Sequence, residues 1–401
     1  MTADLLTDAL FADMEDSVLS VGQARTLPPA VYTSPAFFEF EREVVFGREW
    51  LCVGRESWVS RPGEFFTTTI AGEPILVVRT REGALKAMSP VCQHRAMWVA
   101  EGHGTASSFL CPYHHWCYSL DGALISAPAM ERTENFDPRQ IRLPTFQLEV
   151  WLGFVFVNLD PEAAPLAARL GALTDALAHY DFAAAEGPPP GPPTPFPWNW
   201  KVMMENNNDG YHANKLHHGP LHDFVPSALS QFPELPSDSI GYFRFNDTTH
   251  PDASFNATQR AIMPVFPQLT EIERHRMIFA NVPPTLSLVV TSDMVIYMIL
   301  RPDSADQGEM DVGLLFAPGT MRAPGFEHRL ALYDGAFTAI NAQDMHVDAL
   351  VQKGLRSRFA PRGRYSWQEG AQGAFNRWLV GRYRAGWQRL RGDPAPAAGS
   401  A

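Results

Sequence analysis

The chain has few charges, few cysteines and no long apolar run. Charged residues make up 19% of its 401 residues and hydrophobic residues 45%, a composition typical of a globular protein with ample core. No run of about 18 apolar residues is present, so the sequence predicts no membrane-spanning helix. Four cysteines are too few for a disulfide scaffold, and spaced cysteines in such a chain are more often metal ligands or core residues.

Positive charge is also scarce. The chain has 32 Lys and Arg against 44 Asp and Glu, a formal net charge of -12. Phosphate backbones and anionic lipids attract basic surfaces, so we expect neither a nucleic-acid partner nor a membrane partner. Residues 1–20 lack the basic start and apolar run of a signal peptide, so we expect a cytoplasmic protein. A Gly-rich dinucleotide fingerprint is absent as well, so no nicotinamide-binding reductase is expected in this chain.

The pattern of the chain predicts an α+β protein, with an all-β N-terminal domain and a C-terminal antiparallel sheet packed with long helices. The clearest punctuation is residues 187–197, where seven of eleven positions are proline, which we interpret as a stiff connector. The expected segments are a helical N-terminus (1–40), a β domain (41–160), a helix and Pro-rich linker (161–197), a catalytic domain (198–390) and a disordered tail (391–401).

Alternating apolar residues and turn signals place the individual elements. In the first half, strands are expected at 64–70, 74–80, 84–91, 107–110, 123–128 and 149–159. In the second half, strands are expected at 275–282, 285–292, 294–302 and 310–318. Helical spacing predicts a peripheral helix over 5–20, a helix over 161–180, a helix or helix-loop over 198–218 and a long amphipathic helix over 325–355.

Two cysteines and two histidines form the first constellation. Cys92 and His94 stand as C-x-H, and after sixteen residues Cys111 and His114 stand as C-x2-H, each pair at an expected loop tip. A zinc site uses the same ligand types, but usually with the cysteines and the histidines in separate blocks. The alternation suits a 2Fe-2S cluster with both cysteines on one iron and both histidines on the other, the Rieske arrangement.

At these residues the chain resembles the Rieske domain of the Rieske non-haem iron oxygenases. That family reads C-x-H-R and then C-P-Y-H-G-W-x-Y with a following D-G, and the chain has CQHR at 92–95, CPYHHWCY at 111–118 and DG at 121–122. The departure is His115, where the family usually has Gly. We interpret His115 as a neighbour of the cluster rather than a ligand, and Cys117 and Cys52 as packed strand residues.

The second constellation is Asp209, His212 and His217, spaced D-x2-H-x4-H. On a helix, Asp209 and His212 would share a face, while His217 could join His212 only if the helix loosened or ended near Lys215. Two histidines and a distant carboxylate can form the facial triad of a mononuclear Fe(II) site with open positions for oxygen and substrate. A polar helix with surface histidines is the plainer alternative.

The resemblance extends over this segment, where the family reads N-W-K-x-x-x-E-N-x-x-D/E-x-Y-H-x4-H. Its spacing favours His217 over the adjacent His218 as a ligand. The family's C-terminal helix carries a Glu-Asp pair before V-Q-x-G, and here Gln343-Asp344 precedes VQKG at 351–354. The resemblance therefore implies Asp344 as the carboxylate ligand, with Asp348 one turn later as the alternative.

A chain that carries both sites is implied to be the terminal oxygenase component, the catalytic alpha subunit. The resemblance implies a 2Fe-2S cluster, a mononuclear Fe(II), O2 and a small organic substrate as reactants, and electrons from a separate NAD(P)H reductase, with or without a ferredoxin. It also implies a head-to-tail homotrimer in which Asp209 bridges His212 and His114 of the neighbouring subunit, and leaves room for a beta subunit. A Rieske electron carrier without catalysis and a zinc-stabilised binding module are the alternatives from other classes.

The substrate is the open question at this level. Because ring hydroxylation is the family's broad activity, we expect an aromatic substrate, with monooxygenation or demethylation of a quaternary ammonium, methoxy or N-methyl compound as the alternative. A cage for an organic cation needs several aromatic faces around the iron. Phe245, Phe266 and Tyr297 are candidates for such a cage, and Met203 and Met204 would suit an apolar ring.

Overall fold

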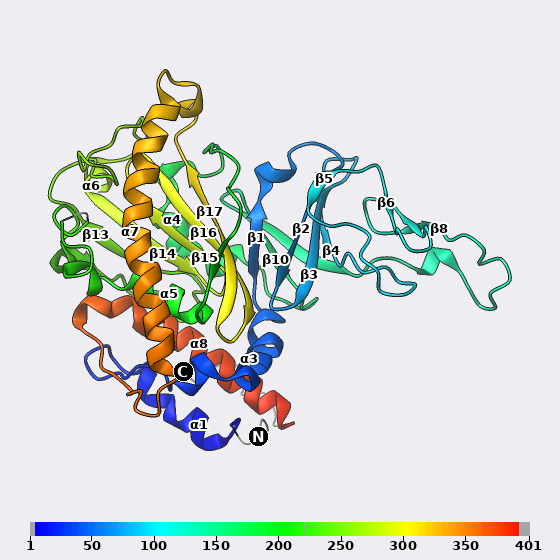
Figure 1. Ribbon diagram of the computed structural model, residues 1–401, viewed down its shortest axis with the longest axis horizontal. Coiled ribbons are helices and arrows are strands. Elements are labelled where there is room, and N and C mark those ends of the chain that lie inside the picture. Colours follow the sequence, from blue (N-terminus) through cyan, green and yellow to red (C-terminus); the bar gives the residue numbers. More distant parts are fainter. Residues whose placement is uncertain (1–4, 220, 393–401) are drawn as a thin grey trace. The chain divides into compact units, whose positions relative to one another are not determined.

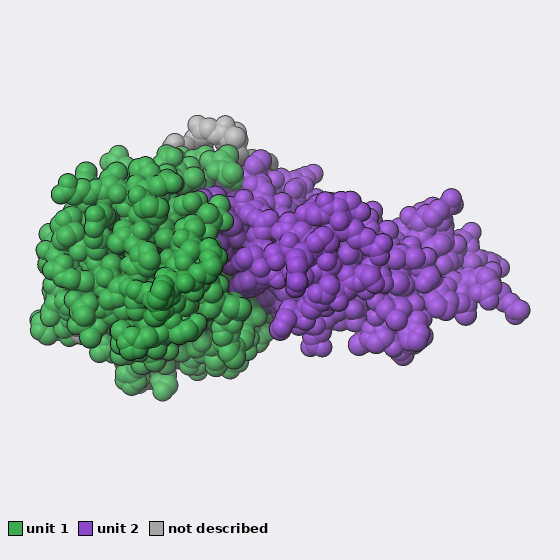
Figure 2. Space-filling view, turned by 90° about the horizontal axis from the view of Figure 1, so that it is seen from above, with its two compact units in different colours: residues 1–45, 167–401 green, residues 46–166 purple. Residues whose placement is uncertain are grey.

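The structure is a computed structural model that describes residues 5–219 and 221–392. It divides into two compact units (Figure 2). The smaller unit comprises residues 46–166, and the larger unit joins the chain before residue 46 to the chain from residue 167 onward. The expected separate N-terminal segment is therefore part of the larger unit. Most of the expected tail, residues 393–401, lies outside the described residues.

The smaller unit is built on a seven-stranded sheet with the order β1-β10-β9-β4-β3-β2-β5, in which all pairings are antiparallel. Its strands are β1 (Leu51–Arg55), β2 (Glu64–Ile70), β3 (Glu73–Arg79), β4 (Leu85–Met88), β5 (His103–Thr105), β9 (Thr145–Trp151) and β10 (Phe154–Asn158). The single strand expected over 149–159 is instead a hairpin. Leu152 (φ 50°) and Gly153 (φ 77°) both take the left-handed conformation of a tight hairpin turn, which the continuous apolar run conceals.

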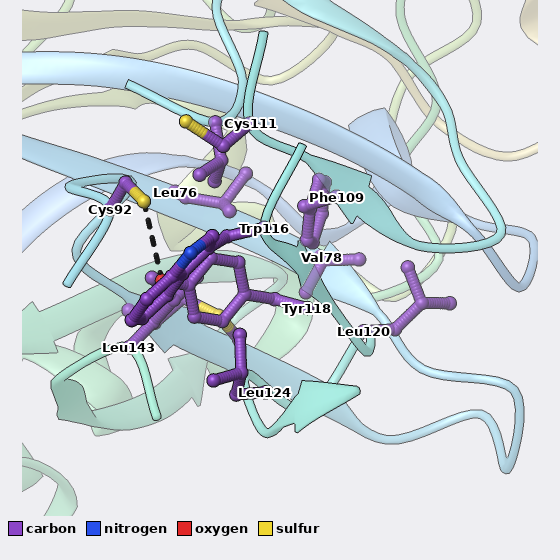
Figure 3. Packing of buried hydrophobic residues seen from close by; sticks show 12 residues of the cluster. Leu76, Val78, Cys92, Phe109, Cys111, Trp116, Tyr118, Leu120, Leu124 and Leu143 are labelled. Atoms are coloured by element: carbon purple, nitrogen blue, oxygen red, sulfur yellow. Dashed lines mark hydrogen bonds between the residues drawn. The ribbon is translucent and has the colours of Figure 1, made fainter. Parts of the chain in front are cut away.

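A three-stranded sheet forms the second layer of the smaller unit, with β6 (Phe109–Leu110), β7 (Cys117–Tyr118) and β8 (Leu124–Ser126). Between the sheets lies a cluster of twelve buried residues that includes Cys92, Cys111, Trp116 and Tyr118. Figure 3 shows the sulfur atoms of both cysteines at one edge of this cluster. The other two cysteines are strand residues, as expected: Cys52 is buried in β1 and Cys117 is half-buried in β7.

The larger unit is built on another antiparallel sheet, with the order β11-β17-β16-β15-β14-β13-β12. Its strands are β11 (Thr194–Phe196), β12 (Ser230–Gln231), β13 (Tyr242–Asp247), β14 (Arg276–Val282), β15 (Leu286–Val290), β16 (Val295–Ser304) and β17 (Gln307–Leu315). The four strands β14–β17 were expected from the sequence. β13 was not, although its alternating YFRFND pattern is typical of a strand.

The Pro-rich segment is not a connector between the two units, contrary to the expectation. Glu186 pairs with Phe316, and β11 pairs with β17, so residues 186–196 run along the edge of the large sheet. Proline lacks the N–H that a central strand must donate, but an edge strand can spare it. The same stiffness that suggested a linker therefore suits this edge.

Two long helices, α7 (Phe326–Leu355) and α8 (Gly370–Leu390), accompany the sheet of the larger unit (Figure 1). The helix α5 (Trp200–Asn208) packs against β14, β15, α7 and α8. The short helices are α1 (Asp8–Asp13), α2 (Ala30–Thr33), α3 (Pro35–Glu41), α4 (Gly171–Ala176) and α6 (Glu271–Arg274). The helices expected over 5–20 and 161–180 are each broken into short helical pieces, whereas the helix expected over 325–355 is continuous.

The N-terminal segment is anchored in the larger unit rather than peripheral to it. Glu41, the last residue of α3, lies 2.7 Å from the ammonium of Lys201 in the first turn of α5, and both side chains are fully buried. The hydroxyl of Tyr383 in α8 donates to the same carboxylate. This cluster ties three helices together at the start of α5, the helix that leads to the predicted iron ligands.

Candidate functional site

Helix α5 ends before the predicted ligands. It stops at Asn208, and Asp209 has extended backbone angles (φ -84°, ψ 106°), so Asp209 and His212 do not share a helical face as expected. Instead, Asp209 Oδ1 accepts the backbone N–H groups of Tyr211 (2.6 Å) and His212 (3.3 Å), which begins a short 3-10 helix, His212–Asn214. Oδ2 of the same carboxylate lies 3.0 Å from Nδ1 of His212. The contact expected between Asp209 and His212 exists, but a turn makes it.

Three of the predicted residues converge on one point. Nε2 of His212 lies 3.2 Å from Nε2 of His217, and Oδ1 of Asp344 lies 2.9 Å from His217 Nε2 and 3.6 Å from His212 Nε2. Among the residues that the structure describes, this is the group of ligand atoms close enough together to hold one metal ion. Three ligands set at right angles, each about 2.1 Å from a metal, would lie about 3 Å apart. The donor set and its spacing therefore fit a facial triad.

Gln343 orients one of these imidazoles. Its Oε1 lies 2.8 Å from Nδ1 of His217, which leaves Nε2 directed at Asp344. Burial works to lower the pKa of His217, which is 1% exposed, but the bonds to Asp344 and Gln343 outweigh burial and raise that pKa above its ordinary value. Partners on the outer nitrogen fix the tautomer and orientation of metal-binding histidines. In the sequence, Gln343 stood only as a departure from the family's Glu.

The structure also separates the two alternatives from the predicted ligands. Asp348 is 3% exposed and takes no part in the group, and its Oδ1 accepts from Asn206 at 3.2 Å. Burial, followed by the charge of Asp344, raises the pKa of Asp348 well above its ordinary value, which favours the protonated form of this carboxyl. His218 is exposed and does not join the group either.

A cavity of about 70 Å³ opens beside the three converging residues, between α7 and the sheet. About 15 Å³ suffices for one water molecule, so this space takes several small groups. Its aromatic walls are Phe255, Phe279 and Phe337, and Met203 also lines it. The cage candidates from the sequence, Phe245, Phe266 and Tyr297, do not line it, nor does Met204. The strand β13 was not expected from the sequence, and nothing in the sequence singled out the segment around Phe255.

Arg244, on β13, brings a positive charge to the wall of this cavity. The residue is 3% exposed, and its guanidinium carbon lies 3.8 Å from the ring centroid of Phe279. Burial lowers its pKa to about 10, and the charge of Asp209 works in the opposite direction, so the group is charged at neutral pH. Burial works to raise the pKa of Asp209, but His212 and the two N–H groups outweigh it and hold that pKa below its ordinary value.

A second cavity of about 490 Å³ lies along the same helix. The Pro-rich edge, Met294, β17 and α7 line it, and Phe337 and Asn341 line both cavities. The space next to the metal-binding group therefore adjoins a larger one on the α7 side.

In the smaller unit, the four predicted cluster ligands lie on two loops of the same form. Cys92 accepts a hydrogen bond from Ala96 N–H and donates to Met97, and Cys111 makes the same pair of bonds with His115 and Trp116. His115 has φ 57°, as does Ala96 at the equivalent place in the other loop. The position that the family usually fills with Gly is thus a left-handed one, which a histidine adopts at some cost, and His115 is exposed as expected of a neighbour.

The two loops bury both cysteines but differ in how far they expose their histidines. Cys92 and Cys111 are 2% and 1% exposed, whereas the ring of His94 is exposed and lies 4.5 Å, centroid to centroid, from that of His114. Nδ1 of His114 is buried and has no hydrogen-bond partner, which a bond to iron would satisfy. Burial, together with the neighbouring His94, lowers the pKa of His114, which favours the neutral form that binds metal.

The spacing of the cysteine and histidine atoms in these loops argues against a single zinc ion. Ligand atoms of a tetrahedral zinc centre lie less than about 4 Å apart. Within the described ranges, the cysteine sulfurs and imidazole nitrogens of these loops do not gather into such a group. A two-iron cluster separates its cysteine end from its histidine end and tolerates the wider arrangement. The hydroxyl of Tyr118 lies 3.3 Å from the sulfur of Cys92, the bond drawn in Figure 3.

None of the helices in the described part of the chain is long and apolar enough to cross a membrane.

Comparison with known proteins identifies both units. Residues 49–146 match the Rieske [2Fe-2S] domain, and residues 173–385, more than half of the chain, match the catalytic domain of the ring-hydroxylating alpha subunits. The first match excludes the zinc module, and the second excludes an electron carrier without a catalytic domain. The match agrees with the Rieske cluster and with the mononuclear iron that this catalytic domain typically holds.

Among curated proteins, the chain is 27% identical to the carnitine monooxygenase oxygenase subunit of Acinetobacter pittii, over 86% of this chain and 89% of that one. It is 35% identical to the corresponding subunit of Escherichia coli K12 over 49% of this chain and 53% of that one. It is 33% identical to the biphenyl 2,3-dioxygenase alpha subunit of Rhodococcus jostii over 52% and 46%.

Solved structures share the fold. A quaternary ammonium Rieske monooxygenase superposes with a TM-score of 0.78 at 24% identity, covering 92% of this chain and 98% of that one. The naphthalene 1,2-dioxygenase of a Rhodococcus species superposes with a TM-score of 0.79 at 20% identity, covering 95% and 99%. The chain belongs to the ring-hydroxylating alpha-subunit family and is the catalytic subunit of a Rieske non-haem iron oxygenase.

Proposed function

We propose that this subunit monooxygenates a quaternary ammonium compound, with electrons from a separate NAD(P)H reductase. The sequence favoured an aromatic substrate and left a quaternary ammonium compound as the alternative. We now prefer the quaternary ammonium compound. The observation that carries it is the match to the carnitine monooxygenase oxygenase subunit, which runs through both units, while the biphenyl dioxygenase match covers about half of the chain.

The lining of the active-site cavity supports this choice. A quaternary ammonium group has no N–H to donate, so proteins bind it with aromatic faces and apolar contacts. Phe255, Phe279 and Phe337 supply three aromatic rings beside the metal-binding group, and aliphatic side chains of the sheet surround them. The same walls would accept an aromatic ring, so the lining alone does not rank the two substrates.

The residues have separate roles in this proposal. His212, His217 and Asp344 would hold a ferrous ion, which would supply oxygen activation when bound. Cys92, His94, Cys111 and His114 would hold the cluster, which would store one electron at a time. Gln343 orients His217 through its outer nitrogen. The overall reaction consumes O2, two electrons and two protons and yields one hydroxylated product and water.

Asp209 is the proposed bridge to a second subunit. Its side chain is 21% exposed, and it contacts His212 through one oxygen while the backbone N–H groups hold the other. In a head-to-tail trimer, this carboxylate would accept a hydrogen bond from His114 of the neighbouring subunit. Asp209→Asn should keep both metals and slow electron transfer by orders of magnitude in a single turnover. Reoxidation of the cluster at the wild-type rate would exclude the bridge.

The direct test is substrate-stimulated oxygen uptake by the iron-loaded protein with a surrogate reductase. We expect uptake and a hydroxylated or demethylated product with trimethylammonium compounds, and none with biphenyl or anthranilate. His217→Ala should abolish product, whereas His218→Ala, one residue away and exposed, should not. Uptake coupled to product with the aromatic compounds alone would overturn the proposed substrate class and leave the oxygenase assignment intact.

A further inference from the structure

Arg244 is a buried cation in the wall of the cavity, and the charge of Asp209 is felt there without a direct ion pair. Its Nη1 donates to Oδ1 of Asn246 at 2.9 Å, and its Nε is buried with no hydrogen-bond partner. No carboxylate among the described residues forms an ion pair with it, although 97% of the residue is removed from solvent. Burying a charge without a partner is costly, so such a group is expected to meet its partner in a complex.

Two contacts hold the guanidinium in the wall of the cavity. One face is stacked on Phe279, at 3.8 Å, and one edge is held by Asn246, which also accepts a hydrogen bond from Ser230. The N–H groups that these contacts leave unused include Nε–H. An arginine with Nε–H and an adjacent amino group free presents the fork that binds both oxygens of a carboxylate.

The charged residues that line the cavity indicate the charge of the substrate group that would pair with Arg244. Asp209 and Asp344 are its carboxylates, and Arg244 is its guanidinium. The two carboxylates together balance the two charges of a ferrous ion, so Arg244 leaves the loaded site with one net positive charge. In a cavity walled by Phe and aliphatic side chains, that excess favours an anionic group on the substrate.

We propose that Arg244 binds a carboxylate of the substrate and so selects zwitterionic trimethylammonium carboxylates over the corresponding alcohols. The inference rests on the proposed function for the cationic end of the substrate and adds the anionic end. Arg244 is then a specificity-determining residue: it contacts the substrate away from the carbon that is oxidised.

The experiment measures equilibrium binding by calorimetry. The protein carries a ferrous ion at the mononuclear site and an oxidised cluster, and no reductase is present. The probes are a trimethylammonium carboxylate and the trimethylammonium alcohol of the same chain length. We expect the wild type to bind the carboxylate at least about ten-fold more tightly, since a charged hydrogen bond contributes that much. In Arg244→Met this preference should vanish through loss of affinity for the carboxylate, while affinity for the alcohol holds or rises. Arg244→Lys should keep part of the preference.

Arg276→Met is the matched control. Arg276 lies on the neighbouring strand β14 and also stacks on a phenylalanine, with its guanidinium carbon 4.4 Å from the ring centroid of Phe245. Unlike Arg244, it pairs with Asp247 at 3.0 Å and does not line the cavity. This variant should keep the preference for the carboxylate. Cluster absorbance and iron content verify that every variant is folded and loaded.

The outcomes separate the two proposals. An equal loss of affinity for both probes in Arg244→Met, or no preference in the wild type, would overturn the carboxylate anchor. If the quaternary compounds fail to bind but benzoate-type carboxylates bind in an Arg244-dependent way, the proposed function is wrong and the anchor stands.

Discussion

Replacing Gln343 with leucine should weaken iron binding without removing a ligand. The side chain makes one contact with the site, the 2.8 Å bond from its Oε1 to Nδ1 of His217. Losing the partner of a ligating histidine typically costs 10–100-fold in metal affinity, which is about 1.4–2.8 kcal/mol. We expect a loss in this range for Gln343→Leu, because His217 could then rotate or change tautomer.

The assay is competition for Fe(II) between the protein and a chelator under anaerobic conditions. Gln343→Glu should retain the affinity of the wild type or exceed it, because a carboxylate also accepts from Nδ1 and makes the imidazole a stronger ligand. His346→Gln, an exposed position on the same helix, serves as the control. If Gln343→Leu binds iron within about two-fold of the wild type, the orienting role is refuted.

Three further predictions follow from the same structure. Asp344→Asn should abolish Fe(II) binding. Asp348→Asn, which changes a carboxyl outside the converging group, should preserve it, and metal analysis with the reverse pattern would exclude the proposed triad. Tyr118→Phe should lower the reduction potential of the cluster by about 40 mV, because it removes a hydrogen bond to the Cys92 sulfur worth about 1 kcal/mol. An unchanged potential in a redox titration would show that this bond does not tune the cluster. Glu41→Ala should cost about 3–5 kcal/mol of unfolding free energy, since it strands the buried ammonium of Lys201, and the double variant Glu41→Met, Lys201→Met should recover most of it in denaturant titrations.

The parts of the site that could be predicted from the sequence share one property: their residues are close together in the chain. Cys92 and His94, Cys111 and His114, and Asp209, His212 and His217 form short spaced motifs. In the structure, both cysteines lie in one buried cluster, and His212 and His217 converge with Asp344. Asp344 was reached only through the family resemblance, because nothing local distinguishes it from Asp348. The distinction is burial, which the distant packing of α7 on α5 creates.

The walls of the cavity could not be predicted in this way. Phe255, Phe279 and Phe337 come from a loop, a strand and a helix, and only the folded sheet brings them together. Arg244 had a weak signal, an arginine at an inward position of the alternating YFRFND strand, but β13 itself was missed. The linker error has a similar origin, since proline content reports backbone stiffness and does not distinguish a connector from an edge strand.

The glutamine at position 343 connects the metal site to the charge of the cavity. A glutamate there would place a carboxylate at Nδ1 of His217, the imidazole whose Nε2 faces Asp344. Such a charge would cancel the excess positive charge that Arg244 gives the loaded site. Gln343→Glu should therefore keep iron but weaken the binding of a carboxylate substrate, while affinity for the alcohol of the same length holds or rises. If the same calorimetric titrations instead give wild-type affinities for both ligands in Gln343→Glu, the net charge of the site does not govern its selectivity. The hydrogen bonds of Arg244 alone would then have to explain the preference for the carboxylate.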